Sequence, residues 1–234
     1  MKRVIGALLR PFGCELTKLP DPFALQAQLV RTADPVIFDL GAYTGEVARI
    51  YRHHFPRATI HCFEPFPESF RELVKNVGGD PRISCHPVAV SDVAGQAWLH
   101  SNRFAPTNSL LATDERGASF WGEGLLDSTS KVEVATTTLD AFCREKGISR
   151  IDILKMDVQG AEFLALKGAS DLLGQARISL IYTELITCPT YQGQHRLGEY
   201  VALLDSVGYE IQDFYNPVRR WGRLMQADYL FVRR

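Results

Sequence analysis

Residues 36–48 have the sequence VIFDLGAYTGEVA, and this stretch decides the fold. An apolar run ends in an acid, passes through two glycines and opens into a helical pattern. This order is typical of the strand–turn–helix start of a nucleotide-binding α/β domain. Gly41 permits a sharp turn off the end of the strand, and Gly45 lets the helix begin close to the strand and to a ligand.

The same stretch indicates which ligand the turn holds. Its glycines are spaced Gly-x-x-x-Gly, so the G-x-G-x-x-G pattern of dinucleotide enzymes is absent from it. The carboxylate of Asp39 would repel a pyrophosphate at close range, whereas it suits a ligand with an ammonium or sulfonium group. S-adenosylmethionine carries both groups, and we expect it to be bound by Asp39, Gly41, Ala42 and Gly45.

A second acid stands at the end of the next expected strand. Residues 60–65 read IHCFEP, and Glu64 lies where folds of this kind hold the two ribose hydroxyls with a carboxylate. Pro65 is expected beside it in the same site. After the third expected strand, Ala89 offers a small surface to adenine and Asp92 offers an acceptor to its exocyclic amine. The alternative interpretation is that each of these acids binds no ligand and is simply exposed to water at the end of its strand.

Length and composition limit the class of protein. The 234 residues, of which 46% are hydrophobic, can bury one sizeable core, so we expect one domain at residues 35–234 after an extension at residues 1–34. The net charge of −1 argues against a nucleic-acid partner. The five scattered cysteines contain no C-x-x-C and favour a reducing, cytoplasmic location.

The first residues resemble the start of a signal sequence. Arg10 and Pro11 interrupt its apolar core, however, and no apolar run in the sequence reaches membrane-spanning length. We expect residues 1–9 to form a short amphipathic helix that docks on the domain. Contact of this helix with a membrane surface is the alternative.

Strand and helix patterns alternate along the rest of the chain. We expect strands at residues 36–40, 58–63, 83–90, 96–100, 132–138, 151–156, 178–183, 209–215 and 229–232. We expect helices at residues 23–30, 67–77, 139–146 and 161–173, after Gly45, and around residues 197–204. The alternation predicts an α/β fold with a mostly parallel, doubly wound sheet. The pattern breaks at residues 102–131, an irregular insertion that is a candidate substrate loop.

In doubly wound sheets, ligands bind beyond the carboxyl ends of the strands. The densest group of polar residues at such an end is KMDVQGAE, residues 155–162, in which strand alternation puts Lys155 and Asp157 on one face. Glu162 stands in the first turn of the next helix, where the macrodipole favours a carboxylate. The alternative for Lys155 is a structural salt bridge with Asp157 or Glu184.

These pieces, in this order, resemble the FkbM family of S-adenosylmethionine-dependent methyltransferases. The matching motifs are FDLGAYTG at residues 38–45, FEP at 63–65, AVSD at 89–92, TLD at 138–140, IDILKMDVQGAE at 151–162, Glu184, and QADYLFV at 226–232. The family often has Glu where this chain has Gln159. The resemblance implies a class I, Rossmann-like, seven-stranded sheet with an antiparallel C-terminal strand. It also implies methyl transfer to a hydroxyl, often on a sugar or a polyketide-like metabolite.

Methyl transfer to an alcohol needs an acceptor held in line with the methyl group and a base that takes its proton. Asp157 is the first candidate for the base or for holding the hydroxyl, and Glu184 is the second. His195 is the third, because its pKa class suits a base near neutrality. Lys155 and Glu162 complete the expected catalytic set. The less favoured alternative is Mg²⁺ held by Asp157, Glu162 and Glu184, whose charge Lys155 would offset.

Two further groups of side chains could contact an acceptor. Residues 107–109 lie at the edge of the irregular segment, and Phe120 and Trp121 could stack on the apolar face of a sugar, although plain packing is the favoured interpretation. The sequence RRWGR at residues 219–223 could bind an anionic acceptor such as a sugar phosphate. A solvated turn is favoured there, because charge clusters usually mark solvated faces.

Other functions occur on such a fold. An NAD-linked oxidoreductase would need a second glycine beside Gly41 and a catalytic Tyr–Lys or similar pair, and the sequence shows neither. A non-catalytic scaffold would show a degraded motif around Lys155, Asp157 and Glu162, whereas a nucleic-acid methyltransferase would usually show a basic groove or an N/D-P-P-Y tetrad. We therefore expect a small-molecule or glycan acceptor. A homo-oligomer is compatible with the sequence.

Overall fold

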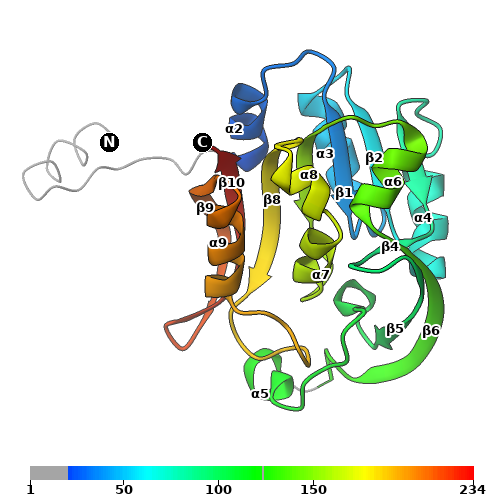
Figure 1. Ribbon diagram of the computed structural model, residues 1–234. Coiled ribbons are helices and arrows are strands. Elements are labelled where there is room, and N and C mark those ends of the chain that lie inside the picture. The colour runs from blue at the N-terminus through cyan, green and yellow to red at the C-terminus, as the bar shows by residue number, and fades with distance from the viewer. Residues whose placement is uncertain (1–20, 123) are drawn as a thin grey trace, which may run out of the picture.

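A computed structural model describes residues 21–122 and 124–234, and its main element is a seven-stranded sheet (Figure 1). The strand order is β3-β2-β1-β7-β8-β10-β9. The strands are β1 (Val36–Leu40), β2 (Thr59–Phe63), β3 (Ile83–His86), β7 (Ile151–Met156), β8 (Ile178–Ile186), β9 (Tyr209–Arg220) and β10 (Arg223–Arg233). Neighbouring strands from β3 to β8 pair in parallel, and β10 pairs antiparallel with β8 and β9. The expected α/β fold with an antiparallel C-terminal strand is confirmed.

Helices cover both faces of this sheet (Figure 1). On one face, α2 (Pro22–Leu29), α3 (Glu46–His54) and α4 (Pro67–Val77) pack against strand residues such as Ile37 and Ile153. On the other face, α6 (Leu139–Lys146), α7 (Glu162–Lys167), α8 (Ser170–Gly174) and α9 (Leu197–Ser206) pack against residues such as Phe38 and Leu154. Successive strand residues point to opposite faces, so the buried strands are apolar on both sides.

The strand expected at residues 83–90 is found as two strands in different sheets. After β3 ends, the chain forms β4 (Ala89–Val90), which joins β6 (Ser128–Thr137) and β5 (Gly95–Asn102) in a three-stranded sheet. Pro87 stands between the two pieces, and a proline has no N–H with which to continue a strand ladder.

The helix expected at residues 161–173 is also found in two pieces, α7 and α8. The chain passes so close to a neighbouring strand end at Gly168 that an added Cβ would stand 2.1 Å from the carbonyl oxygen of Ser91. The carbonyl oxygen of Gly168 also accepts a hydrogen bond from the N–H of Asp140, at 2.9 Å. Close packing between segments far apart in sequence therefore interrupts the helix, and helical periodicity does not show such a contact.

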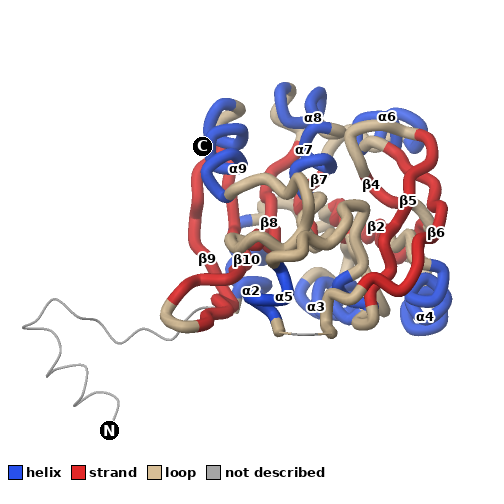
Figure 2. Tube along the Cα trace, turned by 90° about the horizontal axis from the view of Figure 1, so that it is seen from below, coloured by secondary structure: helices blue, strands red, loops and turns tan. Residues whose placement is uncertain are grey.

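The irregular segment is shorter than the expected range 102–131, because β5 extends to Asn102 and β6 begins at Ser128. It contains the 3₁₀-helix η2 (Ala105–Thr107) and the short helix α5 (Gly117–Trp121). Leu126 packs with Ile186, Tyr191 and Met225 in a small separate core. The segment is therefore folded against the ends of β8 and β10, where loops and turns cross the sheet in the view from below (Figure 2).

Most of the expected N-terminal extension, including the amphipathic helix at residues 1–9, lies outside the described residues. Its last part forms α2, and the ring of Phe23 packs edge-on against Tyr51 of α3 with the ring centroids 5.1 Å apart. This part of the extension belongs to the core of the domain. Among the described helices, none is long and apolar enough to cross a membrane.

Candidate active site

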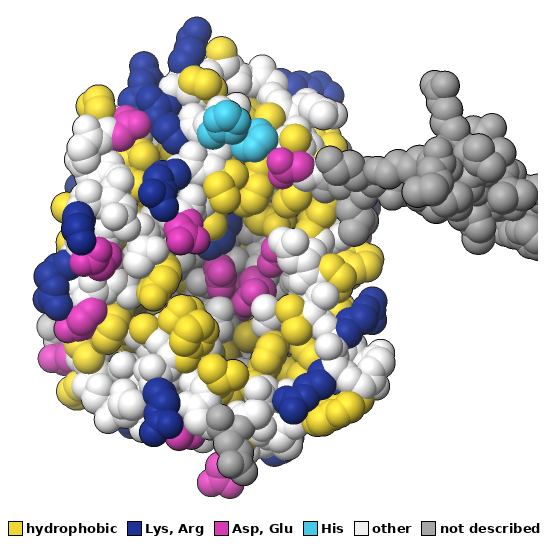
Figure 3. Space-filling view, turned by 180° about the vertical axis from the view of Figure 1, so that it is seen from behind, with side chains coloured by type: hydrophobic (Ala, Val, Ile, Leu, Met, Phe, Trp, Pro, Cys, Tyr) yellow, Lys and Arg dark blue, Asp and Glu magenta, His cyan; other side chains and the backbone are white. Residues whose placement is uncertain are grey.

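Two cavities lie side by side at the carboxyl ends of the parallel strands. The first cavity encloses about 220 Å³ and is lined from β1, β2, β4 and β7, and the second encloses about 320 Å³ and is lined from the irregular segment, β8 and β10. Asp157 and Gln159 line both cavities. Seen from behind, acidic side chains gather in a hollow surrounded by hydrophobic ones (Figure 3). A group bound in one cavity therefore meets a group bound in the other beside Asp157 and Gln159.

The turn after β1 forms one wall of the first cavity. The N–H groups of Gly41 and Ala42 both donate to the carbonyl oxygen of Phe63, at 3.0 Å, which ties the ends of β1 and β2 together. Gly41 has φ +75°, and a Cβ at this position would stand 1.9 Å from the carbonyl oxygen of Asp157. Only glycine fits this turn, because the chain both adopts the left-handed region and touches the end of β7. Gly45 also has a positive φ and packs against α4 rather than lining the cavity.

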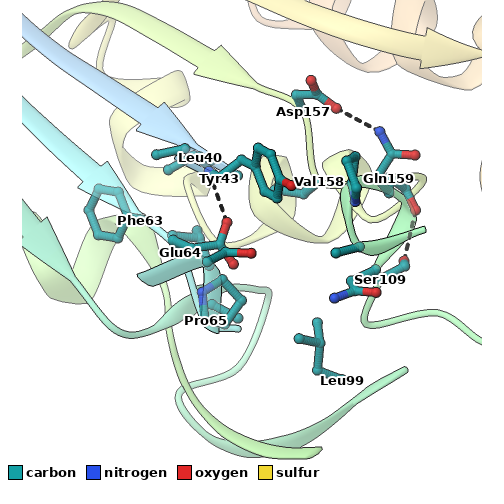
Figure 4. Close-up of a pocket in the computed structure, with 18 of the residues that line it drawn as sticks. Leu40, Tyr43, Phe63, Glu64, Pro65, Leu99, Ser109, Asp157, Val158 and Gln159 are labelled. Atoms are coloured by element: carbon teal, nitrogen blue, oxygen red, sulfur yellow. Dashed lines mark hydrogen bonds between the residues drawn. The ribbon is translucent and has the colours of Figure 1, made fainter. Parts of the chain in front are cut away.

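Glu64 lines the first cavity at the end of β2 (Figure 4). Its Oε2 accepts a hydrogen bond from the N–H of Tyr43, at 2.9 Å, and its Oε1 accepts one from the N–H of Phe66, at 2.8 Å. Burial raises the pKa of Glu64 to about 7, although these two N–H groups oppose the rise. The carboxyl group is thus held in one orientation, with its remaining lone pairs available to hydroxyl donors. Pro65 and Ala89 also line this cavity.

Asp39 is placed differently from the expectation that it contacts a ligand. It is fully buried and lines neither cavity, and its Oδ1 lies 3.2 Å from Nζ of Lys155, its register partner on β7. Nζ of Lys155 also lies 3.7 Å from Oδ2 of Asp157. Burial alone would lower the pKa of Lys155, but the charges of Asp39 and Asp157 raise it overall. Asp39 therefore acts on the site through Lys155, which lines the first cavity and contacts both Asp39 and Asp157.

Glu162 has a structural role in the turn after β7. Its Oε1 accepts hydrogen bonds from the N–H groups of Val158 and Gly160, at 3.0 and 3.2 Å, and its side chain is buried away from both cavities. Burial raises the pKa of Glu162 to about 7. The expectation that Glu162 belongs to the catalytic set does not match this position. Its carboxylate instead holds the loop that carries Asp157 and Gln159.

Glu184 lines the second cavity from β8. Its Oε2 accepts a hydrogen bond from Nε2 of Gln159, at 3.1 Å, and its Oε1 accepts one from Nε2 of Gln226, at 2.7 Å. Burial and the nearby charges of Asp157 and Asp228 raise the pKa of Glu184 well above its usual range. Glu184 is therefore held by two side-chain amides in a buried, acidic environment.

Two other expected residues lie away from both cavities. The ring of His195 stacks on Phe163 with the centroids 3.7 Å apart, and its Nδ1 lies 2.9 Å from Oε1 of Glu199. Asp92 is exposed and accepts a hydrogen bond from Oγ of Ser91, at 3.1 Å. Neither His195 nor Asp92 lines either cavity, and each contacts residues near it in the sequence or on its own part of the fold.

The alternative metal site is not assembled. Over residues 21–122 and 124–234, no three His, Cys, Asp or Glu side chains are grouped so that they could hold a metal ion. Asp157 and Glu184 share the amide of Gln159, while Glu162 faces backbone N–H groups. The set of Asp157, Glu162 and Glu184 therefore does not form the ligand cluster considered from the sequence.

Aromatic and apolar side chains line the mouth of the second cavity. Phe104, Trp121 and Leu125 contribute to it from the irregular segment, and Nε1 of Trp121 donates to Oγ1 of Thr190, at 2.7 Å. Phe120 points elsewhere and lies under the guanidinium of Arg223, 5.2 Å from its ring centroid. Residues 107–109, expected near the site, do contact it: Asn108 and Ser109 line the first cavity and Thr107 the second.

The arginine-rich stretch at residues 219–223 is the turn of the β9–β10 hairpin. Trp221 and Gly222 both have positive φ angles, +50° and +75°, as a tight hairpin turn requires. Trp221 is 76% exposed, and the guanidinium of Arg220 lies 4.5 Å from its ring centroid. These residues do not line either cavity. The stretch is therefore an exposed turn, as the sequence favours.

Three residues that shape the site could not be identified from the sequence patterns. Tyr43 orients Glu64 through its N–H, whereas Tyr191 and Gln226 line the second cavity from the loop after β8 and from β10. The loop at residues 187–195 stands out in the sequence only for its histidine. Gln226 begins the motif of the last strand, and a polar residue at the start of a buried strand is the one signal that could have identified it.

Comparisons with known proteins agree with this geometry. A family model described as "Methyltransferase FkbM domain" matches residues 39–211. The 2-O-methyltransferase NoeI of Sinorhizobium fredii is 31% identical over 210 residues, which cover 85% of this chain and 84% of that protein. The 31-O-demethyl-FK506 methyltransferase FkbM of Streptomyces tacrolimicus is 28% identical over 207 residues, which cover 78% of this chain and 75% of that protein.

A solved structure shows the same fold at much lower sequence identity. An rRNA methylase from Streptococcus thermophilus superposes with a TM-score of 0.52 at 10% identity, over 93% of this chain and 99% of that chain. At this identity the likeness shows the fold alone, and a shared fold leaves the substrate open.

Proposed function

We infer the reaction from the fact that this chain belongs to the FkbM family of S-adenosylmethionine-dependent methyltransferases, and we propose that it methylates a hydroxyl group of a small-molecule acceptor. Sugars, glycans and polyketide-like molecules are the acceptors that fit the proposal. The observation that carries it is that Asp157 and Gln159 line both cavities, so that cofactor and acceptor meet beside them. Residues 35–234, together with α2, would form the methyltransferase domain.

The residues of the first cavity fit S-adenosylmethionine, whose bound form supplies a methyl group on a sulfonium. The buried carboxyl of Glu64 is already oriented by two N–H groups, and ribose hydroxyls would donate to its remaining lone pairs. Ala89, Val90 and Leu99 provide an apolar wall for a flat base. Gly41 leaves the turn free of side-chain atoms, so the backbone can approach the ligand closely.

Asp157 would act as the base that accepts the proton of the acceptor hydroxyl. Its side chain lines both cavities and is 37% exposed, and the ammonium of Lys155 compensates part of its charge. Glu184 is less suited to this role, because it lines only the second cavity and both of its oxygens already accept hydrogen bonds from Gln159 and Gln226. We propose that Glu184 instead binds the acceptor through a hydrogen bond.

The second cavity favours a carbohydrate over a purely apolar acceptor. Phe104 and Trp121 offer aromatic surface for the apolar face of a sugar ring, while Glu184 and Gln226 offer hydrogen-bonding groups to its hydroxyls. Cavities of this composition place a few polar groups among apolar walls, which fixes the orientation of a ligand. A hydroxyl beside Asp157 would then be the one that is methylated.

Radiolabelled S-adenosylmethionine tests the proposal. The purified protein is incubated with a panel of methyl glycosides, short oligosaccharides and a macrolide polyol, and the label is followed into the product. Calorimetric titration with S-adenosylhomocysteine and with NAD, each with and without EDTA, is run in parallel. Binding of S-adenosylhomocysteine with transfer to a glycoside hydroxyl supports the proposal. Failure of S-adenosylhomocysteine to bind, or transfer only to a nitrogen, carbon or sulfur acceptor, would contradict it.

A further inference from the structure

Gln159 has an unusual backbone conformation between the two cavities. Its φ of +55° lies in the left-handed region, which residues with a long side chain seldom adopt. Its carbonyl oxygen accepts a hydrogen bond from Oγ of Ser109, at 2.7 Å (Figure 4), and Glu162 binds the N–H groups on either side of it. Strain of this kind persists only where the surrounding structure imposes it, and it is common at functional sites.

The side-chain amide of Gln159 lies between the two carboxyl groups of the site. Nε2 donates to Oδ1 of Asp157, at 2.8 Å, and to Oε2 of Glu184, at 3.1 Å. Only this orientation of the amide fits, because the opposite one would turn its oxygen toward two carboxyl groups. The hydroxyl of Tyr191 lies 3.1 Å from Oε1 of Gln159 and shares its proton between this atom and the carbonyl oxygen of Thr107.

The residue type at position 159 also determines the charge between the cavities. Asp157 and Glu184 share one neutral donor, and only the ammonium of Lys155, 3.7 Å from Asp157, supplies positive charge close to them among the described residues. A carboxylate in place of the amide would bring a further negative charge to hydrogen-bonding distance of both. Like charges this close oppose ionisation and raise the pKa of the group.

We propose that Gln159 is the positioning residue of the methyl transfer. Its amide holds the carboxylate of Asp157 at the boundary of the two cavities, while it keeps Glu184 in place as an acceptor-binding group. Tyr191 holds the amide in the required orientation. This inference rests on the proposed function, in which Asp157 is the base, but it makes a separate statement about how the two carboxyl groups titrate.

The titration is measured by ¹³C NMR of side-chain carboxyl groups, with the signal of Asp157 assigned from Asp157→Asn. Because Asp157 and Glu184 interact, the apparent midpoints belong to the pair. In Gln159→Glu, which keeps the shape of the side chain, the midpoint seen at Asp157 is expected to rise by about one pH unit or more. Gln159→Met removes the donor without adding charge, and a smaller rise is expected.

Gln192→Glu is the matched control. Gln192 is exposed on the same loop as Tyr191, lines neither cavity, and its Nε2 donates only to the carbonyl oxygen of Thr113 among the described residues. The control adds the same charge to the protein, and the Asp157 midpoint is expected to stay unchanged. Thermal unfolding of all variants identifies any that fail to fold. If Gln159→Glu does not fold, the Asp157 midpoint measured in Gln159→Met tests the inference.

A kinetic readout separates the inference from the proposed function. With a glycoside that the wild type methylates, Gln159→Met is expected to lower kcat at pH 7 by ~10-fold or more with a smaller effect on the acceptor KM, because Asp157 is no longer held in place beside the hydroxyl. Midpoints and a kcat equal to those of the wild type would overturn the inference. If the wild type methylates no glycoside, the proposed acceptor class fails, and the carboxyl titration alone still decides the role of Gln159.

Discussion

The two cavities of the site are built in different ways. The first is walled by the turn after β1 and the ends of β2 and β4, where Gly41 and the carboxyl group of Glu64 lie, and residues of the irregular segment such as Asn108 and Ser109 also line it. The second is assembled from η2 and α5, the loop after β8 and the start of β10, which lie far apart in the chain. The turn and the acid of the proposed cofactor cavity thus come from two adjacent strand ends, whereas the proposed acceptor cavity depends mostly on packing between distant segments.

The largest expected effect is at Asp157, which belongs to both cavities. Asp157→Ala removes the proposed base and should lower the rate of methyl transfer by ~10²–10⁴-fold. The affinity for S-adenosylhomocysteine should change little, because Glu64 and the glycine turn remain. Single-turnover kinetics and calorimetric titration measure the two quantities. Unchanged transfer would remove Asp157 from the chemistry.

The next prediction compares the loss of stability caused by alanine at two glycines, one near each cavity. Gly41 and Gly193 have similar φ angles, +75° and +74°, but a Cβ at Gly41 would collide with Asp157, whereas no described atom lies within 4 Å of a Cβ at Gly193. Gly193→Ala should lower the free energy of unfolding by roughly 1–2 kcal/mol, the cost of a left-handed L-residue. Gly41→Ala should lower it by roughly 1–3 kcal/mol more, because the turn is also overpacked. Denaturant unfolding gives both values, and equal losses would contradict the close contact.

A third prediction concerns Glu64, which belongs to the first cavity alone. Glu64→Gln should weaken binding of S-adenosylhomocysteine by roughly 10–100-fold, because hydrogen bonds to a charged group contribute about 1.5–3 kcal/mol each. The KM of the acceptor should stay near its wild-type value. Calorimetry and acceptor kinetics measure these two quantities. A change in the KM of the acceptor alone would show that the first cavity binds the acceptor and not the cofactor.

Glu64 also predicts a pH dependence of binding. Burial raises its pKa from 4.5 to about 7 in the free protein, so its contribution to stability is fully present below pH 4.5 and is lost as the pH rises through 7. Ribose hydroxyls favour the ionised carboxylate, so affinity should rise with pH up to about 7 and then level off, with proton release below that pH. Titrations in buffers of different ionisation enthalpy measure the released protons. Glu64→Gln should abolish the part of this release that comes from Glu64.

The smallest expected effect tests the second cavity. Trp121→Phe keeps an aromatic ring but removes the hydrogen bond from Nε1 to Oγ1 of Thr190. A hydrogen bond of this kind contributes about 0.5–1.5 kcal/mol, so the KM of the acceptor should rise by roughly 2–10-fold. Affinity for S-adenosylhomocysteine should remain unchanged. An equal loss of cofactor affinity would contradict the assignment of Trp121 to the second cavity alone.

Several elements follow the sequence pattern closely, and others do not. The helices at residues 67–77 and 139–146 and the strand at residues 151–156 are found at the expected bounds. The first helix begins with a proline at its first position, and the second is capped by a threonine. The strand is a mostly apolar, fully buried run. The break at Gly168 and the three-stranded sheet carry no local signal, because they depend on contacts with distant segments.

The sequence by itself determined the α/β fold, the glycine turn and the acids at the strand ends. These depend on short-range periodicity and on glycine geometry, which are visible in any window of the chain. Only the tertiary structure decided which acids face a cavity. Asp39 and Asp157 look alike in the sequence, yet Asp39 is buried against Lys155 and Asp157 lines both cavities. The difference arises because a side chain's environment is set by the elements that pack over its face, and these come from elsewhere in the chain.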